Sequence, residues 1–245
     1  MDFYSFTPIA AALYAGYQFL LTLGALLAPF GGTASAALAV VALTLLVRTV
    51  LIPVGISQVR AEIARRRLSP KLAELQRRYK NNRELLARKT MELYTSERVS
   101  PLAGVGPLLL QAPVLSLVYG LFIVPVINGH PNTLLTEQLF GVELGTSLAS
   151  VLGSGTVWPA PAVFLALLVV IAMVAGVSRR VALRTAMPIA DDATPATRRL
   201  ASSLTWLPFL TVAFAAFVPL AAAIYLATTT LWTLIERTVL RRALL

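Results

Sequence analysis

The sequence predicts an all-α polytopic membrane protein with a five-span helical core. An N-terminal interfacial helix precedes the core, which carries a cytoplasmic helical hairpin. The 245 residues are 57% hydrophobic and only 13% charged, with a mean hydropathy of +0.76. A soluble domain of this size carries about twice that charged fraction. Long apolar segments recur along the chain, and the basic residues fall between only some of them.

The distribution of the basic residues predicts the orientation of the protein across the membrane. Of the 21 Lys and Arg residues, twelve lie in residues 57–100, five in 178–200 and three after residue 234. The hydrophilic segments 1–6 and 128–158 contain none. Because cytoplasmic segments of membrane proteins are enriched in Lys and Arg, we expect 57–100, 178–200 and the C-terminus to be cytoplasmic. The N-terminus and 128–158 are then outside.

The first apolar segment, residues 8–29, is long enough to span a bilayer. Its polar side chains share one helical face, namely Tyr14, Tyr17, Gln18 and Thr22. Such a face also suits a helix that lies in the membrane interface. We favour an interfacial helix on the outer side over a span, and we expect residues 1–33 to form this unit and 34–245 the core.

The first predicted span, residues 36–56, contains a single charged residue, Arg48. A central arginine costs roughly 2.5–3.5 kcal/mol on insertion, so it usually faces a wet or protein-lined interior. Helical side chains tilt toward the N-terminus, which directs Arg48 away from the cytoplasmic water. Pro53 leaves the carbonyl of Thr49 without its helical partner. These features predict a polar cavity inside the membrane.

The basic segment 57–100 reads as an antiparallel helical hairpin. Ser69 and Pro70 form a typical helix start, with serine as N-cap and proline at the first helical position. Asn81 and Asn82 then interrupt the pattern between two apolar stripes. The alternative is a solvated charged loop beside the membrane.

Four further spans are expected at residues 107–127, 160–177, 203–217 and 220–234, with a cytoplasmic loop at 178–200. The last two segments have fifteen residues each, which rise only about 22 Å against a hydrocarbon core of about 30 Å. Two such short spans side by side predict local thinning of the bilayer, tilting or a water-accessible end.

No Asp or Glu lies inside any predicted span, so the charge of Arg48 must be met by water, by polar groups or by a partner from outside the chain. Alone, each polar side chain in the spans is typical of ordinary contacts between membrane helices. As a group around a buried arginine, they predict the wall of a hydrophilic pocket. The candidates are Arg48, Thr44, Gln111, Tyr119, Thr211, Tyr225, Thr228 and Thr229.

Enzymatic and ion-coupled functions fit this sequence poorly. His130 is the only histidine and there is no cysteine, so neither a Ser–His dyad nor a zinc motif is present. No carboxylate pair is available for acid–base chemistry, and no intramembrane acidic relay for coupled transport. We expect no enzyme activity, no cofactor and no metal, and a protein that handles a partner physically.

The order of several segments resembles the YidC/Oxa/Alb family of membrane protein insertases over about residues 35–236. These segments read LTLLVRTVLIPV, LSPKLAELQRRYKNNRELLARKTMELY, SPLAGVGPLLLQAPVLSLVYGLF and WLPFLTVAFAAFVPLAAAIYLATTTLW. The resemblance implies a protein of the bacterial cell membrane that inserts and helps fold newly made membrane proteins, with or without the Sec translocon. It places Arg48 in a hydrophilic groove that is closed on the outer side, and it adds Gln111 and Tyr225 as matching positions.

The resemblance also implies partners: nascent membrane-protein clients, the ribosome, the Sec translocon and anionic lipids, with no DNA and a monomeric protein. The hairpin would meet ribosomal RNA, lipid or client by non-specific electrostatics. Its candidate residues are Arg65, Arg66, Arg67, Lys71, Arg77, Arg78, Lys80 and Arg83. Two other functions stay open, a small passive channel or transporter for an anionic solute that uses the same buried arginine, and a structural subunit of a larger complex.

Overall fold

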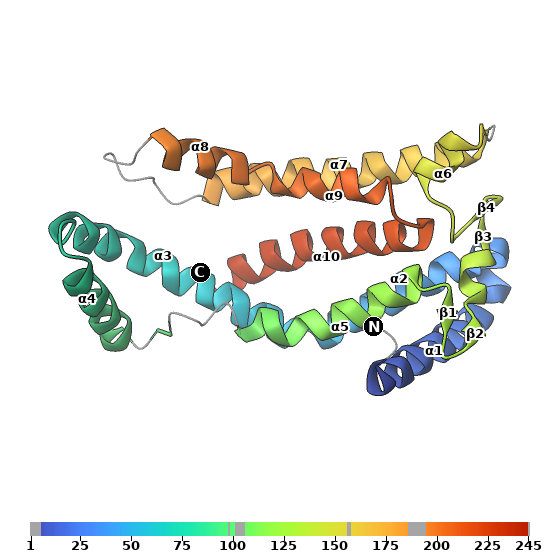
Figure 1. Cartoon of the computed structure of the whole chain (residues 1–245), viewed down its shortest axis with the longest axis horizontal. Coiled ribbons are helices and arrows are strands. Elements are labelled where there is room, and N and C mark those ends of the chain that lie inside the picture. The colour runs from blue at the N-terminus through green and yellow to red at the C-terminus, as the bar shows by residue number, and fades with distance from the viewer. Residues whose placement is uncertain (1–5, 98, 101–105, 156–157, 186–194, 245) are drawn as a thin grey trace.

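The computed structural model describes residues 6–97, 99–100, 106–155, 158–185 and 195–244. Long helices run side by side along the molecule, and four short strands form two hairpins at one end (Figure 1). The helices are α1 Thr7–Gly31, α2 Ser35–Val50, α3 Ile52–Arg78, α4 Arg83–Ser96, α5 Gly106–Ile123, α6 Leu148–Gly153, α7 Ala160–Thr185, α8 Pro195–Leu204, α9 Leu207–Ala215 and α10 Leu220–Leu244. The described chain is therefore mostly helical, as predicted.

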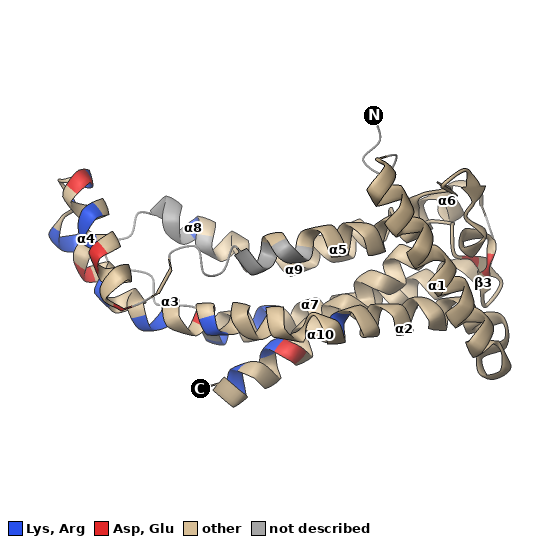
Figure 2. Cartoon of the chain, turned by 90° about the horizontal axis from the view of Figure 1, so that it is seen from below, with Lys and Arg blue, Asp and Glu red and all other residues tan. Residues whose placement is uncertain are grey.

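The helix α1 runs steeply across the direction that α2 and α10 share (Figure 2). It packs against α2 and α5. Gly32 follows α1 with a φ of +51°, a conformation that L side chains rarely adopt, and a short 3-10 helix at Gly32–Ala34 then leads into α2. This glycine lets the chain reverse within a few residues.

The predicted helix start at Ser69 and Pro70 is wrong, because α3 runs without interruption from Ile52 to Arg78 and contains Pro70. Pro70 removes one backbone hydrogen bond. Contacts on either side of it nevertheless hold the helix together, since Leu68 is buried and Lys71 pairs with Glu97. The interruption lies earlier, at Leu51 between α2 and α3, and Pro53 occupies the first turn of α3, where no N–H is needed.

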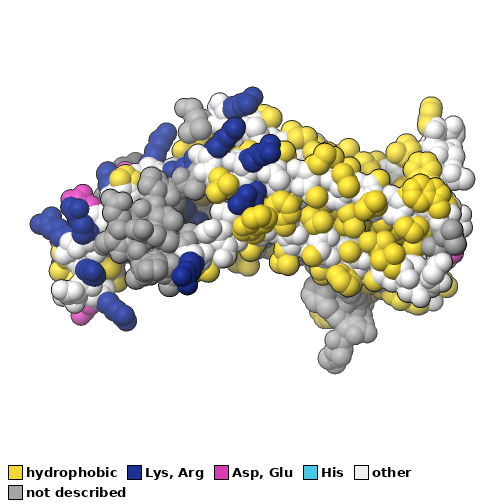
Figure 3. All heavy atoms as spheres, turned by 90° about the horizontal axis from the view of Figure 1, so that it is seen from above, with side chains coloured by type: hydrophobic (Ala, Val, Ile, Leu, Met, Phe, Trp, Pro, Cys, Tyr) yellow, Lys and Arg dark blue, Asp and Glu magenta, His cyan; other side chains and the backbone are white. Residues whose placement is uncertain are grey.

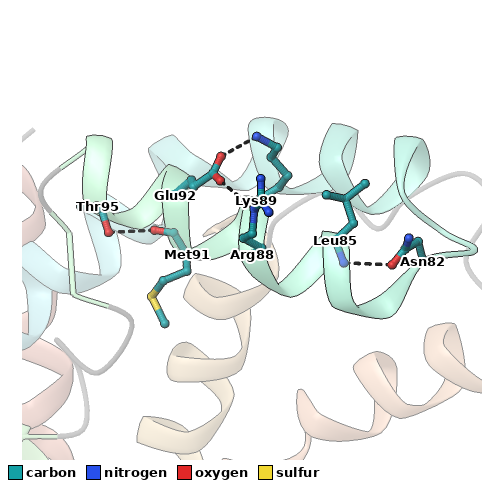
Figure 4. Close-up of polar contacts among 7 residues, drawn as sticks. All are labelled: Asn82, Leu85, Arg88, Lys89, Met91, Glu92 and Thr95. Atoms are coloured by element: carbon teal, nitrogen blue, oxygen red, sulfur yellow. Dashed lines mark hydrogen bonds and ion pairs between the residues drawn. The ribbon is translucent and has the colours of Figure 1, made fainter.

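The turn predicted at Asn81 and Asn82 is confirmed. The side chain of Asn82 accepts a hydrogen bond from the backbone N–H of Leu85 at 3.0 Å and so begins α4 (Figure 4). Within α4, Lys89 lies 2.6 Å and Arg88 3.3 Å from the carboxylate of Glu92. The hydrogen bond from Lys89, assisted by Arg88, lowers the pKa of Glu92 below its ordinary value.

Two helices in the second half of the chain continue beyond the predicted spans, whose boundaries stay predictions. The helix α7 extends past residue 177 to Thr185, and α10 extends past residue 234 to Leu244. The span predicted at 203–217 is broken, since α8 ends at Leu204 and α9 begins at Leu207. Pro208 lacks the N–H that would bond to the carbonyl of Leu204, which favours a break between the two helices at this point.

The end of the molecule opposite α4 is closed by a compact cap, residues 126–153. It contains the hairpins β1 Val126–Ile127 with β2 His130–Pro131 and β3 Gln138–Leu139 with β4 Val142–Glu143, the 3-10 helix Thr133–Thr136, and α6. The backbone N–H groups of Leu220 and Ala221 bond to carbonyls of the cap at 2.8 and 2.9 Å, so the cap is tied to the start of α10.

Two polar side chains fix this cap to the helices. The buried amide of Asn132 donates to the carbonyls of Leu121 and Val124 at 2.8 and 3.0 Å. The hydroxyl of Tyr17 on α1 accepts from the backbone N–H of Thr133 at 3.1 Å. The short elements of the cap are held against the helices because these buried donors and acceptors are paired.

The surface divides into a charged end and an apolar body. Lys and Arg gather over α3, α4 and the end of α10, while the cap end shows only acidic charges (Figure 2). Hydrophobic side chains cover most of the face beside the charged end (Figure 3). Large exposed apolar residues on α2, α7 and α9, and in the turn after α9, are Leu45, Leu46, Leu165, Val169, Met173, Leu210, Phe214 and Phe217. A surface patch of this kind indicates contact with a membrane or a partner.

Candidate functional site

Arg48 lies near the end of α2 with only 8% of its surface exposed. Its Nε–H donates a long hydrogen bond, 3.4 Å, to the hydroxyl of Thr229 on α10. Thr44, one turn earlier on the same face, is 1% exposed, and its hydroxyl bonds to the carbonyl of Val40 within α2. The guanidinium is therefore enclosed between two helices that meet from distant parts of the sequence.

Aromatic side chains border this arginine on the side nearer the cap. Tyr225 on α10 is buried, with its ring centre 6.4 Å from that of Tyr119 and 5.7 Å from that of Phe122, both on α5. Tyr225 lies one turn before Thr229, the hydrogen-bond partner of Arg48, on the same helix. Aromatic packing of this kind leaves little room for water, so it closes the polar region on the cap side.

A cavity of about 190 Å³ opens from Arg48 toward the charged end of the molecule. It lies between α2, α3, α5 and α10, and it has room for several water molecules. Its lining residues are Arg48, Leu51, Gly55, Gln58, Val59, Leu115, Thr233, Glu236, Arg237 and Leu240. A cavity with both polar and apolar lining side chains therefore lies beside Arg48, and its role as a hydrophilic groove stays a prediction.

Glu236 on α10 lines the same cavity as Arg48, so a carboxylate of this chain lies closer to the arginine than the sequence predicts. Among the described residues, no ion pair joins a carboxylate to Arg48. The predicted span ended at residue 234, but the helix continues for ten more residues, which brings Glu236 and Arg237 to the cavity. The site thus combines two guanidinium groups with one carboxylate.

The remaining predicted residues are placed less closely around the arginine. The hydroxyl of Thr228 bonds to the carbonyl of Ile224 in its own helix at 2.9 Å. Thr211 lies on α9, which packs against α7 and α10, and it is not among the side chains that line the cavity. Gln111 belongs to α5, but its side chain lies outside the described residues.

Sequence reasoning missed Gln58, Thr233, Glu236 and Arg237 as lining residues. The spacing of Thr229, Thr233 and Glu236 follows one face of a helix. Extending the last span by one turn would have included this face. Predicting Gln58 as a lining residue would have required knowing that α3 follows α2 directly.

The predicted basic residues occupy α3, the following turn and the first position of α4. Arg65 and Arg66 are half-buried, and Arg66 lies 3.7 Å from Glu62. The others are exposed: Arg67, Lys71, Arg77, Arg78, Lys80 and Arg83. Glu62 also accepts from Arg241 at 2.7 Å, which ties α3 to the end of α10.

These features define a helical membrane protein with a buried arginine in a polar cavity that opens toward its charged end. Two helical segments, Thr7–Val50 and Ala160–Arg184, are long and apolar enough to cross a membrane, and a shorter apolar helix covers Ala112–Ile123. The sequence matches the family described as 60Kd inner membrane protein over residues 27–244. The chain belongs to this family, the YidC/Oxa/Alb family, and is a bacterial membrane protein.

Several curated relatives carry the name membrane protein insertase YidC. The protein from Clostridium perfringens is 40% identical over 93 residues, 38% of this chain and 39% of that protein. The protein from Oceanobacillus iheyensis is 36% identical over 98 residues, again 38% and 39%. The protein from Fusobacterium nucleatum is 32% identical, with 43% of this chain and 62% of that protein covered. The matched segments thus span about two fifths to three fifths of these relatives.

Proposed function

We propose that this protein inserts newly made membrane proteins into the bacterial cell membrane and assists their folding. The observation that carries the proposal is the cavity at Arg48, which is lined by charged, polar and apolar side chains and is bordered by aromatic side chains on the cap side. A client segment brings polar groups part-way into hydrocarbon, and an unsolvated polar group there is costly. A wet cavity beside lipid lowers that cost.

The proposed orientation places α3, α4 and the C-terminus in the cytoplasm and the N-terminus and the cap outside. The gathering of Lys and Arg at one end supports it (Figure 2). The spanning helices would be α2, α5, α7, α9 and α10. The steep angle of α1 to α2 supports an interfacial α1. Since α9 has only nine residues, rising about 14 Å, local thinning of the bilayer at this helix forms part of the proposal.

The exposed basic side chains of α3 and α4 would contact anionic lipid, ribosomal RNA or the client. These contacts are non-specific and weaken with salt. Burial of the client's apolar helix in lipid would supply the driving force, at about 25 cal/mol per Å². The protein would act as a monomer, alone or beside the Sec translocon, without an enzymatic step or a cofactor.

The test is depletion of the protein in its host, followed by insertion of a single-span client with an acidic outer tail. We expect the client to remain protected from external protease after depletion. Re-expression of the intact protein should restore cleavage of the tail. Proteoliposomes made from the same protein report anion flux. Unchanged client insertion together with measurable anion flux would overturn the proposal in favour of an anion channel or transporter.

A further inference from the structure

The side chain of Glu236 lines the same cavity as Arg48 and has a defined hydrogen-bond partner. Its carboxylate accepts a hydrogen bond from the indole N–H of Trp232, one turn earlier on α10, at 3.0 Å. Glu236 is half-buried, and its neighbours in the cavity include Arg48, Arg237 and Thr233. A carboxylate at this depth costs free energy unless cations and hydrogen-bond donors compensate it. The cavity provides both.

Gly55 on α3 creates room for this carboxylate. A Cβ at residue 55 would lie 2.0 Å from one carboxylate oxygen of Glu236 and 2.9 Å from its Cδ. Any side chain larger than hydrogen would therefore displace the carboxylate from α3. The backbone of Gly55 does not adopt a conformation that requires glycine. Its missing side chain instead allows the carboxylate of Glu236 on α10 to lie close to α3.

The charges that face Glu236 come from two helices. Arg48 projects from α2 and Arg237 from α10, and both side chains line the cavity with Glu236. In a cavity of about 190 Å³, the carboxylate of Glu236 is opposite in charge to both guanidinium groups, and the two guanidinium groups are like charges. Without Glu236, two guanidinium groups would share a small cavity with no negative group in its described lining. Glu236 thus sets the net charge that a segment entering the cavity meets.

We propose that Glu236 is the resident counter-charge of Arg48 and determines how strongly the cavity retains acidic groups of a client. This inference rests on the proposed insertase function. An acidic client side chain must compete with Glu236 for Arg48, so its stay is brief enough to allow release into the lipid. With Glu236 neutralised, Arg48 would hold client carboxylates longer and would discriminate more strongly against neutral clients.

The test uses site-specific photocrosslinking from residue 115 of the full chain to ribosome-stalled single-span clients. Leu115 lines the cavity and carries no charge. Two clients differ only in two Asp or two Asn residues before the span. For Glu236→Gln, we expect the ratio of crosslinking to the acidic over the neutral client to rise about two- to fivefold, the range that a part-exposed ion pair typically contributes. Glu143→Gln on the exposed β4 strand is the matched control and should leave the ratio unchanged.

A second variant keeps the proposal testable if Glu236→Gln fails to accumulate. Gly55→Ala displaces the carboxylate of Glu236 from α3 but keeps its charge in the protein. This variant should therefore raise the ratio of crosslinking to the acidic over the neutral client by a smaller factor. Gly176→Ala on α7, where an added Cβ meets nothing within 4 Å, is its control. An unchanged ratio in either accumulating cavity variant overturns the role of Glu236. If the unmodified protein crosslinks and inserts neither client, the proposed function itself fails.

Discussion

The Nε–H of Arg48 donates to the hydroxyl of Thr229 at 3.4 Å and so joins two helices whose contacting residues are 181 positions apart. This contact is long for a hydrogen bond and contributes modestly by itself. Its importance lies in geometry, because it directs the guanidinium toward α10 and the cavity that Glu236 also lines.

Arg48→Ala should reduce insertion of a single-span client about tenfold, equivalent to about 1.4 kcal/mol. Arg48→Lys should keep part of the activity, since the proposed role needs a positive charge more than the planar guanidinium. Protease protection of the client in inverted membrane vesicles measures both. Equal inactivity of the two variants would show that the fixed hydrogen-bonding geometry of the guanidinium is required. A tolerated or stabilising Arg48→Leu would instead favour a structural subunit.

Thr229→Val should lower the free energy of unfolding by about 0.6 kcal/mol, the average for polar contacts between membrane helices. The reason is that Arg48 loses its acceptor on α10. The matched control is Thr228→Val, whose hydroxyl bonds only within its own helix among the contacts described. Reversible unfolding in mixed micelles compares them. A control that loses as much stability as Thr229→Val would contradict the contribution of the Arg48 contact.

Asn132→Ala should destabilise the protein by about 2–4 kcal/mol, because the carbonyls of Leu121 and Val124 lose a buried donor. Gln138→Ala on the exposed part of the same cap should change stability by less than about 0.5 kcal/mol. Thermal unfolding in detergent gives both values. A similar shift for the two variants would mean that Asn132 does not anchor the cap.

The contact between Lys89 and Glu92 should stabilise α4 only above a threshold pH. The pKa of Glu92 is lowered by its hydrogen bond from Lys89, so the stabilisation is present above the ordinary value of 4.5 and is lost as pH falls through the lower, folded value. Hydrogen-exchange protection of α4 in the full chain should be lower for Glu92→Gln than for the unmodified protein at about pH 6, and the difference should shrink as the pH falls below 4.5. A difference that persists in acid would point to a helix effect unrelated to charge.

Hydropathy and charge in the sequence were sufficient to predict a helical membrane protein and to identify Arg48 as an exceptional residue. Both follow from local composition, because apolar length and buried charge carry large transfer free energies. The break at Asn82 was equally local, since an N-cap requires only its own side chain and the next turn. Helix ends were predicted less well. Pro70 reads as a helix start, yet contacts on both sides keep it inside α3.

Only the tertiary structure decided which groups surround Arg48. The sequence placed Glu236 beyond the last span and therefore gave Arg48 no acidic neighbour. In the folded protein α10 continues past that point, and Gly55 on α3 leaves space for the carboxylate. The physical reason is that a side chain's environment depends on which helix faces pack together, and helical periodicity in one segment does not specify its partner. The sequence determined that a long apolar segment carries a lone arginine, and packing of α10 against α2 and α3 determined which groups share its cavity.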